Sequence, residues 1–234
     1  MSTLRKRFWK SVDIVEVEGG FAVQLDGRGI KTPAKTALNV PTRAIADMVA
    51  AEWDAQGDKI DPETMPATRA ANAALDKVQV QFDDVASMLT DFGDTDLLCY
   101  RADGPEGLIA RQAAAWDPLL AWSSSRFGVE WVVTSGVMPT AQNPETRRKL
   151  AAHIAGFSAF QMTAFHDLVS LPGSLVIGLA ATEHVAPAQT LWEASRIDEI
   201  WQIEQWGDDE EAQNLAKRRH QAFLNAVRFY DACE

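Results

Sequence analysis

Hydrophobic and polar residues alternate along residues 12–40, and two glycine-containing dipeptides, Gly19-Gly20 and Asp26-Gly27, interrupt the alternation. A period of two is typical of strands with one buried face, and both dipeptides favour the positive φ angles of tight hairpin turns. The pattern predicts a β-meander of three or four short strands. Its third strand is expected at residues 28–32 and its fourth at residues 37–40.

After Pro41 the apolar positions take helical spacing. Thr42 is a suitable N-cap, and Ile45, Val49 and Trp53 recur on one helical face. Beyond residue 62 helical signals dominate. The predicted helices are residues 67–77, 82–92, 105–127, 144–157, 188–206 and 208–230.

Two further segments have a distinct pattern. An extended interruption is expected at residues 129–133. The uncharged run at residues 168–182 is broken by Pro172 and Gly173 and is shorter than the roughly 20 residues of a bilayer span. We therefore predict that it is a buried core segment.

The boundary between the last two predicted helices is marked by its residue types. Gly207 suits the left-handed C′ position that ends one helix, and Asp208 with Glu211 three residues later resembles a capping box that starts the next. A tight helix-helix corner is expected here.

These patterns together predict an α+β fold with a small N-terminal β-meander domain packed on a larger C-terminal all-α domain. The expected domains are residues 1–60 and 61–234, with the boundary near residues 58–62. The chain has no linker rich in Gly or Ser and no internal repeat, so the two parts are expected to pack directly on each other.

The amino-acid composition limits the classes of molecule that the protein could bind. Hydrophobic residues form 47% of the 234-residue chain and charged residues 24%, which is sufficient for a core without metals or disulfides. The formal net charge of -11 would repel a phosphate backbone or an anionic membrane surface. We expect no nucleic-acid partner and no membrane insertion.

The cysteines and the N-terminus indicate a reducing compartment. Cys99 and Cys233 are far apart and lack disulfide-framework or metal-ligand spacing. Residues 1–10 are basic but have no apolar core or cleavage site for export, and acidic residues follow at once. We expect a bacterial cytoplasmic protein or an already processed form.

Residues that could support catalysis are scarce. No phosphate-binding loop of the Walker type is present, and the four histidines lack metal-ligand spacing. Asp91, Asp94 and Asp96 could hold a divalent cation for a metal-dependent hydrolase, but capping and turn formation explain them better. We expect no enzyme activity, no bound metal and no cofactor.

The chain contains eight tryptophans. Most are expected in the core, because large aromatic side chains at helical spacing usually pack inward. Any exposed tryptophan would indicate a protein-protein contact surface, where this residue is favoured.

Several short segments, in this order and spacing, resemble one known family and span residues 6 to 230. They are Lys6-Arg7-Phe8-Trp9, Gly19-Gly20-Phe21, Leu25-Asp26-Gly27-Arg28, Lys31-Thr32-Pro33, Glu52-Trp53-Asp54, Asp94-Thr95-Asp96, Cys99-Tyr100-Arg101, Trp116-Asp117-Pro118, Phe127-Gly128-Val129, Ser195-Arg196, Gln202-Ile203 and Trp206-Gly207. The chain resembles the ATP12-type assembly chaperones, which bind the α subunit of the catalytic head of F-type ATP synthase.

The resemblance implies an N-terminal β domain followed by a helical domain, and a chaperone that shelters the unassembled α subunit until the β subunit replaces it. It implies a mitochondrial location in eukaryotic relatives. We expect no cofactor and a monomer when free. Glu210 matches an acidic residue implicated in the family's function, and we expect partner binding by Glu210 and its neighbours Trp201, Trp206, Asp208 and Glu211.

Two alternatives to this interpretation remain at this point. Glu210 lies at the start of a predicted helix, where a carboxylate is favoured by the helix dipole whatever the function. The chain could also be a scaffold for a different protein partner.

Overall fold

The computed structural model describes residues 5–136 and 140–234. Residues 1–4, which belong to the segment tested for an export signal, lie outside the described residues. Within the described part, contacts divide the chain into two units. The first unit contains the described residues up to Phe82 together with Ser158–Ala164 and Arg228–Glu234, and the second contains Asp83–Phe157 and Phe165–Val227.

An antiparallel sheet forms the centre of the first unit. Its strands are β1 (Val12–Val17), β2 (Gly20–Leu25), β3 (Arg28–Gly29) and β4 (Asn39–Val40). Strand β2 pairs with β1 along one edge and with both short strands, β3 and β4, along the other. The predicted meander is confirmed, although its third and fourth strands are shorter than expected.

One of the two hairpin turns lies where it was predicted, and the other is displaced by one residue. Asp26 and Gly27 have φ angles of 48° and 76°, as a two-residue type I′ turn requires. In the first hairpin Val17 pairs with Gly20, so the turn residues are Glu18 and Gly19 and not the two glycines. Gly20 is instead needed because a Cβ there would collide with the carbonyl oxygen of Val40.

The predicted helix after residue 41 is also confirmed, as α1 (Arg43–Asp54). The Thr42 side chain accepts a hydrogen bond from the backbone N–H of Ile45, and Ile45 and Val49 are buried. This helix packs against β1, β2 and β4 and against α2 (Pro66–Ala73). Because α2 lies on α1, the predicted domain boundary at residues 58–62 falls inside the first unit.

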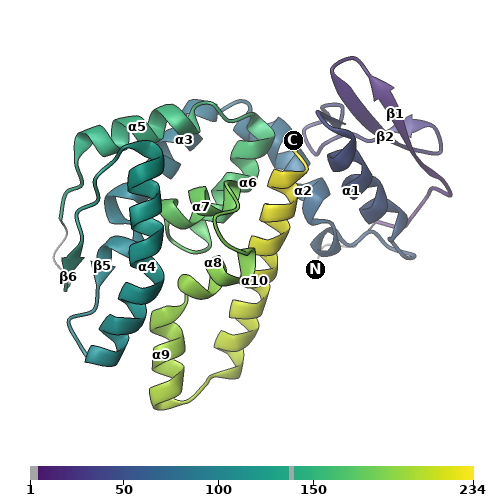
Figure 1. Ribbon diagram of the computed structural model, residues 1–234. Helices are drawn as coiled ribbons and strands as arrows, with labels where there is room; N and C mark the ends of the chain where they lie inside the picture. Colours follow the sequence, from purple (N-terminus) through teal and green to yellow (C-terminus); the bar gives the residue numbers. More distant parts are fainter. Residues whose placement is uncertain (1–4, 137–139) are drawn as a thin grey trace. The chain divides into compact units, whose positions relative to one another are not determined.

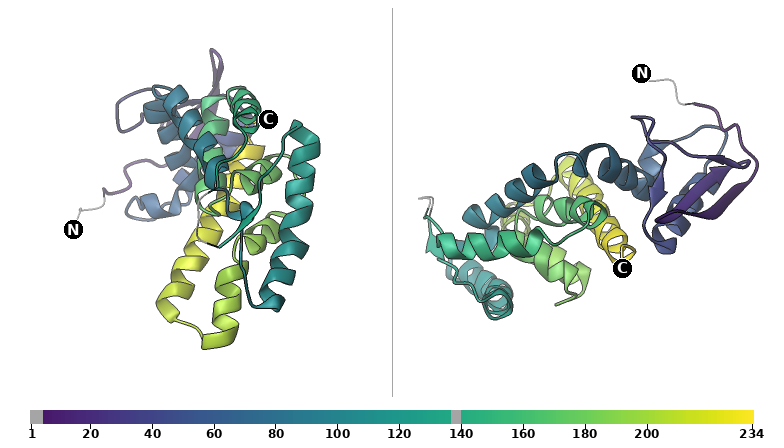
Figure 2. Two further views of the ribbon diagram at one scale, coloured as in Figure 1. Left: turned by 90° about the vertical axis from the view of Figure 1, so that its left-hand side faces the viewer. Right: turned by 90° about the horizontal axis from the view of Figure 1, so that it is seen from above.

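Helices make up most of the remaining chain (Figures 1 and 2). They are α3 (Phe82–Asp91), α4 (Glu106–Phe127), α5 (Pro144–Ile154), α6 (Ala159–Ser170), α7 (Leu175–Thr182), α8 (Ala188–Ala194), α9 (Ile197–Trp206) and α10 (Glu210–Asp231), with short helical turns at Pro62–Thr64, Ala74–Val78, Phe92–Thr95 and Leu97–Cys99. The α+β fold class is therefore confirmed.

Helix α7 is the centre of the second unit. All eight of its residues are buried, and it packs against α4 and α8. The prediction of a buried core segment at residues 168–182 is confirmed. Its helical form was not predicted, because a helix that is apolar on every side has no amphipathic period.

The expected interruption of the helices at residues 129–133 is confirmed, because these residues are neither helix nor strand. The strand pair nearby is β5 (Tyr100–Arg101) with β6 (Thr134–Ser135), and the two run parallel. One prediction in the second unit is wrong in detail. The predicted helix at residues 188–206 is broken at Ser195 and Arg196 into α8 and α9. At the break, the indole N–H of Trp116 donates to the carbonyl oxygen of Ala194, at 2.7 Å, and occupies the acceptor that a continuous helix would use.

Candidate partner-binding site

The acidic residues proposed as an alternative metal site do not converge. Asp91 and Asp94 both form ion pairs with Arg147, whose guanidinium lies 2.9 Å from the Asp94 carboxylate. Asp96 points elsewhere and is fully buried. Across residues 5–136 and 140–234, no group of three or more His, Cys, Asp or Glu side chains could hold a metal ion. The hydrolase alternative therefore loses the site that it required.

Asp96 has a structural use. Its carboxylate accepts hydrogen bonds from the backbone N–H groups of Leu98 and Val176, at 3.0 and 2.9 Å, and from the hydroxyl of Ser174, at 2.7 Å. It thus caps the turn at Leu97–Cys99 and the first turn of α7 at once, as capping predicted. Burial raises the pKa of Asp96 to about 6, although these hydrogen bonds favour the ionised form.

The residues expected to bind a partner lie at the hairpin between α9 and α10. The two helices run side by side in opposite directions, as Figures 1 and 2 show. Trp206 is 79% exposed, and it is the one exposed member of the eight tryptophans, all of which are described. Asp208, Glu210 and Glu211 are exposed as well. The structure therefore gathers four of the five predicted residues into one surface, the α9–α10 tip.

The predicted helix cap at this corner is displaced by one residue. Asp209, and not Asp208, accepts from the backbone N–H groups of Glu211 and Ala212, at 3.4 and 3.1 Å. Gly207 has φ 88° and ψ 178°, which is positive in φ but is not the left-handed helical conformation that was expected. Because Asp209 supplies the cap, Asp208 and Glu210 are available for other contacts.

Trp201, the fifth predicted residue, is half-buried against α4. The guanidinium of Arg111 lies 4.9 Å from the centre of its ring, and a Cβ at Gly107 would come within 2.9 Å of its edge. Arg111 also forms a two-pronged ion pair with Glu204, at 2.8 and 2.9 Å. This ion pair raises the pKa of Arg111 and lowers the pKa of Glu204. Trp201 therefore attaches α9 to α4 and is a support of the tip.

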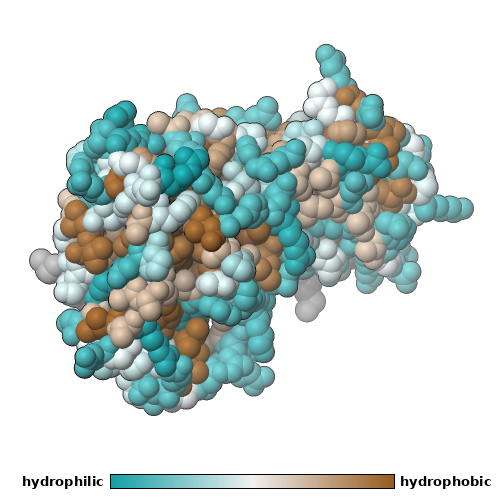
Figure 3. All heavy atoms as spheres, in the orientation of Figure 1, coloured by the Kyte–Doolittle hydropathy of each residue, from teal (hydrophilic) through white to brown (hydrophobic). Residues whose placement is uncertain are grey.

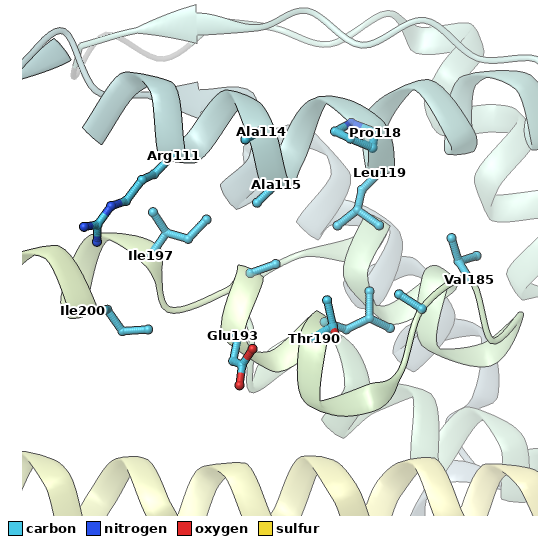
Figure 4. A pocket seen from close by; sticks show the side chains of 13 residues that line it. Arg111, Ala114, Ala115, Pro118, Leu119, Val185, Thr190, Glu193, Ile197 and Ile200 are labelled. Atoms are coloured by element: carbon cyan, nitrogen blue, oxygen red, sulfur yellow. The ribbon is translucent and has the colours of Figure 1, made fainter. Parts of the chain in front are cut away.

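An apolar groove of about 540 Å³ lies between α4 and the α8–α9 pair (Figure 4). Its lining residues are Arg111, Ala114, Ala115, Pro118, Leu119, Val185, Ala186, Thr190, Leu191, Glu193, Ala194, Ile197 and Ile200. Sequence reasoning did not find this groove. The available signal was a run of three alanines at residues 113–115 next to a proline inside a helix.

Two of the short segments that carried the family resemblance meet at α4 beside the groove. In Trp116-Asp117-Pro118, Trp116 is buried and bonds to the α8–α9 break, and Asp117 forms an ion pair with Arg101, at 2.8 Å. Arg101 comes from another of those segments and lies over the Trp116 ring. Pro118 lines the groove itself. These residues hold α4 beside the α8–α9 break.

Charge is distributed unequally between the two units. Residues 5–82 contain 11 acidic and 11 basic side chains, whereas the second unit contains 20 acidic and 10 basic side chains. The excess is concentrated near the groove and tip, where residues 188–211 include eight Asp or Glu and one Arg. Figure 3 shows hydrophobic side chains interrupting the hydrophilic surface of this unit. The candidate site is therefore apolar with an acidic rim.

No helix within the described part of the chain is both long enough and apolar enough to span a membrane.

The chain is similar to proteins from bacteria and from a fungus. It is 48% identical to Atp12 from Paracoccus denitrificans, whose crystal structure matches with a TM-score of 0.95 over 98% of this chain and 99% of that one. The Atu1473 protein of Agrobacterium tumefaciens is 37% identical, with a TM-score of 0.95 over 99% of this chain and 87% of that one. The mitochondrial protein atp12 of Schizosaccharomyces pombe is 25% identical over 90% of this chain and 76% of its own length.

The family model described as ATP12 chaperone protein matches residues 6–124, which is half of the chain. The crystal structures extend the similarity to nearly all of it, including the groove and the α9–α10 tip. The chain therefore belongs to the ATP12 chaperone family.

Proposed function

We propose that this chaperone binds the unassembled α subunit of the F1 part of F-type ATP synthase, covers its apolar interface and releases it to the β subunit. The observation that carries the proposal is the exposed Trp206 at the acidic α9–α10 tip, in a member of the ATP12 chaperone family that also has an apolar groove. An exposed tryptophan and an apolar groove are each typical of surfaces that contact another protein.

Holding a subunit in this way needs no chemical step. An unassembled subunit exposes the apolar surface that its partner will later cover, and such surface aggregates. Binding lowers the concentration of the exposed form by mass action, and the β subunit displaces the chaperone because it covers the same surface permanently. We propose accordingly that the protein is not an enzyme, uses no cofactor and is a monomer when free.

We place the partner-binding site at the α9–α10 tip. Trp206 supplies the apolar contact and Asp208, Glu210 and Glu211 supply negative charge around it, while Trp201 supports the tip from α4. Among the described residues no side chain or backbone group donates a hydrogen bond to the Glu210 carboxylate. A role for Glu210 in the partner contact therefore fits its surroundings better than capping, which Asp209 provides.

The proposal is tested by light scattering of the isolated α subunit in the absence of nucleotide. We expect an equimolar amount of this chaperone to suppress the rise in scattering, and an equal amount of bovine serum albumin to have no such effect. Unchanged scattering would contradict the proposal. A second test is affinity capture from extract of the source cells, with the bound protein identified by mass spectrometry. Recovery of the α subunit would contradict the scaffold alternative. Recovery of a different protein without the α subunit would support that alternative.

We propose a cytoplasmic location, which fits the bacterial Atp12 structures, and the fungal relative is mitochondrial by name.

A further inference from the structure

The groove between α4 and the α8–α9 pair has a shape, a polarity and a charge that together specify a ligand. We propose that it binds an amphipathic helical segment of the client protein, with the apolar face of that segment in the groove and its Lys or Arg side chains against the acidic rim. The inference rests on the proposed chaperone function, and it names the kind of client segment that the chaperone recognises.

Contacts between α4 and the α8–α9 pair hold the groove open. The Trp116 indole donates to the carbonyl oxygen of Ala194, and the Gln112 side-chain amide donates to the Asp198 carboxylate, at 2.6 Å. The Arg111 guanidinium, next to Gln112 on α4, is clamped between Glu204 and Trp201. A groove that is already formed in the free protein loses little conformational entropy when it binds a ligand.

Small side chains leave the space between the helices empty. Ala114 is exposed on α4 and Ala115 is half-buried, and Figure 4 shows both on the wall that faces α8 and α9. The opposite wall contributes Leu191, Ile197 and Ile200. The volume of about 540 Å³ is in the range of sites that enclose several apolar groups.

Pro118 adds one polar group to this wall. Proline has no backbone N–H, so the carbonyl oxygen of Ala114 does not receive the hydrogen bond that residue i+4 gives it in a regular helix. Both residues line the groove. A Lys or Arg side chain of the client could donate to this oxygen, which would fix the position of the bound segment.

Helix α9 borders the groove at Ile197 and Ile200. Ile203 and Trp206 follow at intervals of three residues, with exposed fractions of 39% and 79%. Because an α-helix turns by about 100° per residue, Trp206 lies about half a turn around α9 from Ile197 and does not extend the groove. A client helix in the groove contacts α9 at Ile197 and Ile200, as amphipathic helices do in apolar grooves.

Charge decides which amphipathic segment fits. Residues 188–211 contain eight acidic side chains and one basic side chain. Two of these acids are paired, Glu199 with Arg196 and Glu204 with Arg111. Among the described residues, Glu193 on the groove lining and Asp198, which follows the lining residue Ile197, have no cationic partner. An acidic segment would meet like charge at Glu193 and Asp198. A basic segment is therefore favoured in both its encounter rate and its orientation.

The probe for the test is a fluorescein-labelled 16-residue helical peptide. It has Leu at positions i, i+3, i+4 and i+7 of each two-turn repeat, so that one face is apolar, and Lys or Ala elsewhere. Its partner peptide has Glu in place of every Lys. Fluorescence anisotropy is measured with the full-length chain. We expect the Lys peptide to bind at least tenfold more tightly than the Glu peptide, and equal binding of the two would overturn the inference.

Two variants locate the binding. Ala114→Phe fills the groove, and Ala121→Phe places the same side chain at another exposed position of α4 outside the groove lining. We expect at least a tenfold loss of Lys-peptide affinity for Ala114→Phe and less than a twofold change for Ala121→Phe. Thr190→Trp, on the opposite wall, is the substitute if Ala114→Phe lacks the wild-type melting transition, and the same loss is expected. Equal affinity of the filled and control variants would overturn the inference.

The α subunit distinguishes the two proposals. If the wild type and Ala114→Phe suppress its aggregation equally, the groove inference is overturned and the proposed function stands. If the wild type does not suppress aggregation but binds the Lys peptide in the groove, the proposed function is overturned and the groove chemistry stands. A wild-type dimer that Ala114→Phe converts to a monomer would show that a second copy of this chain occupies the groove, and would also overturn the inference.

Discussion

Two acidic runs of this chain, residues 91–96 and residues 208–211, are similar in composition and differ in surroundings. In the first run Asp96 is fully buried, and two backbone N–H groups and a hydroxyl bind its oxygens. In the second run every residue is exposed, and only Asp209 is used for capping. Carboxylates thus maintain the fold in one place and are exposed to solvent in the other, because burial decides which groups a carboxylate can bind.

The largest effect is expected from Asp96→Ala. The substitution leaves the N–H groups of Leu98 and Val176 and the hydroxyl of Ser174 buried without an acceptor, and each such group costs about 1–3 kcal/mol. We expect a loss of about 3–5 kcal/mol in the free energy of unfolding, measured by urea denaturation. The control is Asp94→Ala, which removes a surface ion pair and should cost less than about 1 kcal/mol. Equal losses for the two variants would show that the burial of Asp96 has no special importance.

The pH dependence of stability gives a slightly smaller effect with a defined sign. Burial raises the pKa of Asp96 from 3.8 to about 6, so the folded state binds a proton more tightly than the unfolded state. The stability contribution of the group is therefore complete below pH 4, falls as the pH rises from about 4 to 6, and is constant above that, for a total of about 3 kcal/mol.

The difference in unfolding free energy between the wild type and Asp96→Asn, which does not titrate, isolates this group. We expect the advantage of the wild type to decrease between pH 4 and pH 6. An advantage that grows over the same interval would show that the hydrogen bonds to the carboxylate outweigh its burial.

Trp206→Ala is expected to weaken binding of the α subunit by about 2 kcal/mol, or roughly thirtyfold, because exposed tryptophans dominate the binding energy of such surfaces. Isothermal titration calorimetry measures the change. The matched control is Phe8→Ala, which removes an exposed aromatic side chain from the first unit, where Phe8 is 71% exposed, and should leave affinity unchanged. A larger loss for Phe8→Ala than for Trp206→Ala would move the binding site to the first unit.

The smallest effects on stability are expected at Glu210, where charge reversal separates capping from binding. Glu210→Gln should lower the unfolding free energy by about 0.3–1 kcal/mol through the lost helix-dipole interaction. Glu210→Lys should leave the fold intact and abolish capture of the α subunit in a pull-down, if the carboxylate faces the partner. Capture that survives Glu210→Lys would reduce the role of Glu210 to the start of α10.

Local signals explain the parts of the fold that were predictable. Thr42 caps α1 through the N–H of a residue three positions away, and Asp26 with Gly27 turns the chain within two residues, so both features depend on adjacent sequence. The α9–α10 tip was predictable for the same reason, because its members are consecutive or nearly so. The shift of the cap from Asp208 to Asp209 is within the precision of such boundary signals.

Long-range contacts explain the features of the fold that could not be predicted from the sequence. At the break between α8 and α9, the carbonyl oxygen of Ala194 accepts from the indole of Trp116, which is 78 residues away. The Asp96 carboxylate accepts hydrogen bonds from Ser174 and Val176 at the start of α7, which are a similar number of residues away in the sequence. Helix α7 lacks a hydrophobic period because neighbouring elements surround it completely.

The sequence by itself determined the meander, the first helix, the acidic balance and the family to which the chain belongs, because these follow from short-range spacing, composition and the order of short motifs. Only the tertiary structure decided that Asp91 and Asp94 pair with Arg147 while Asp96 is buried, and that Ala114 and Pro118 meet Leu191 and Ile197 across a groove. The physical reason is that burial and cavities are properties of residues brought together from distant positions, and no local pattern specifies which distant residue will be the neighbour.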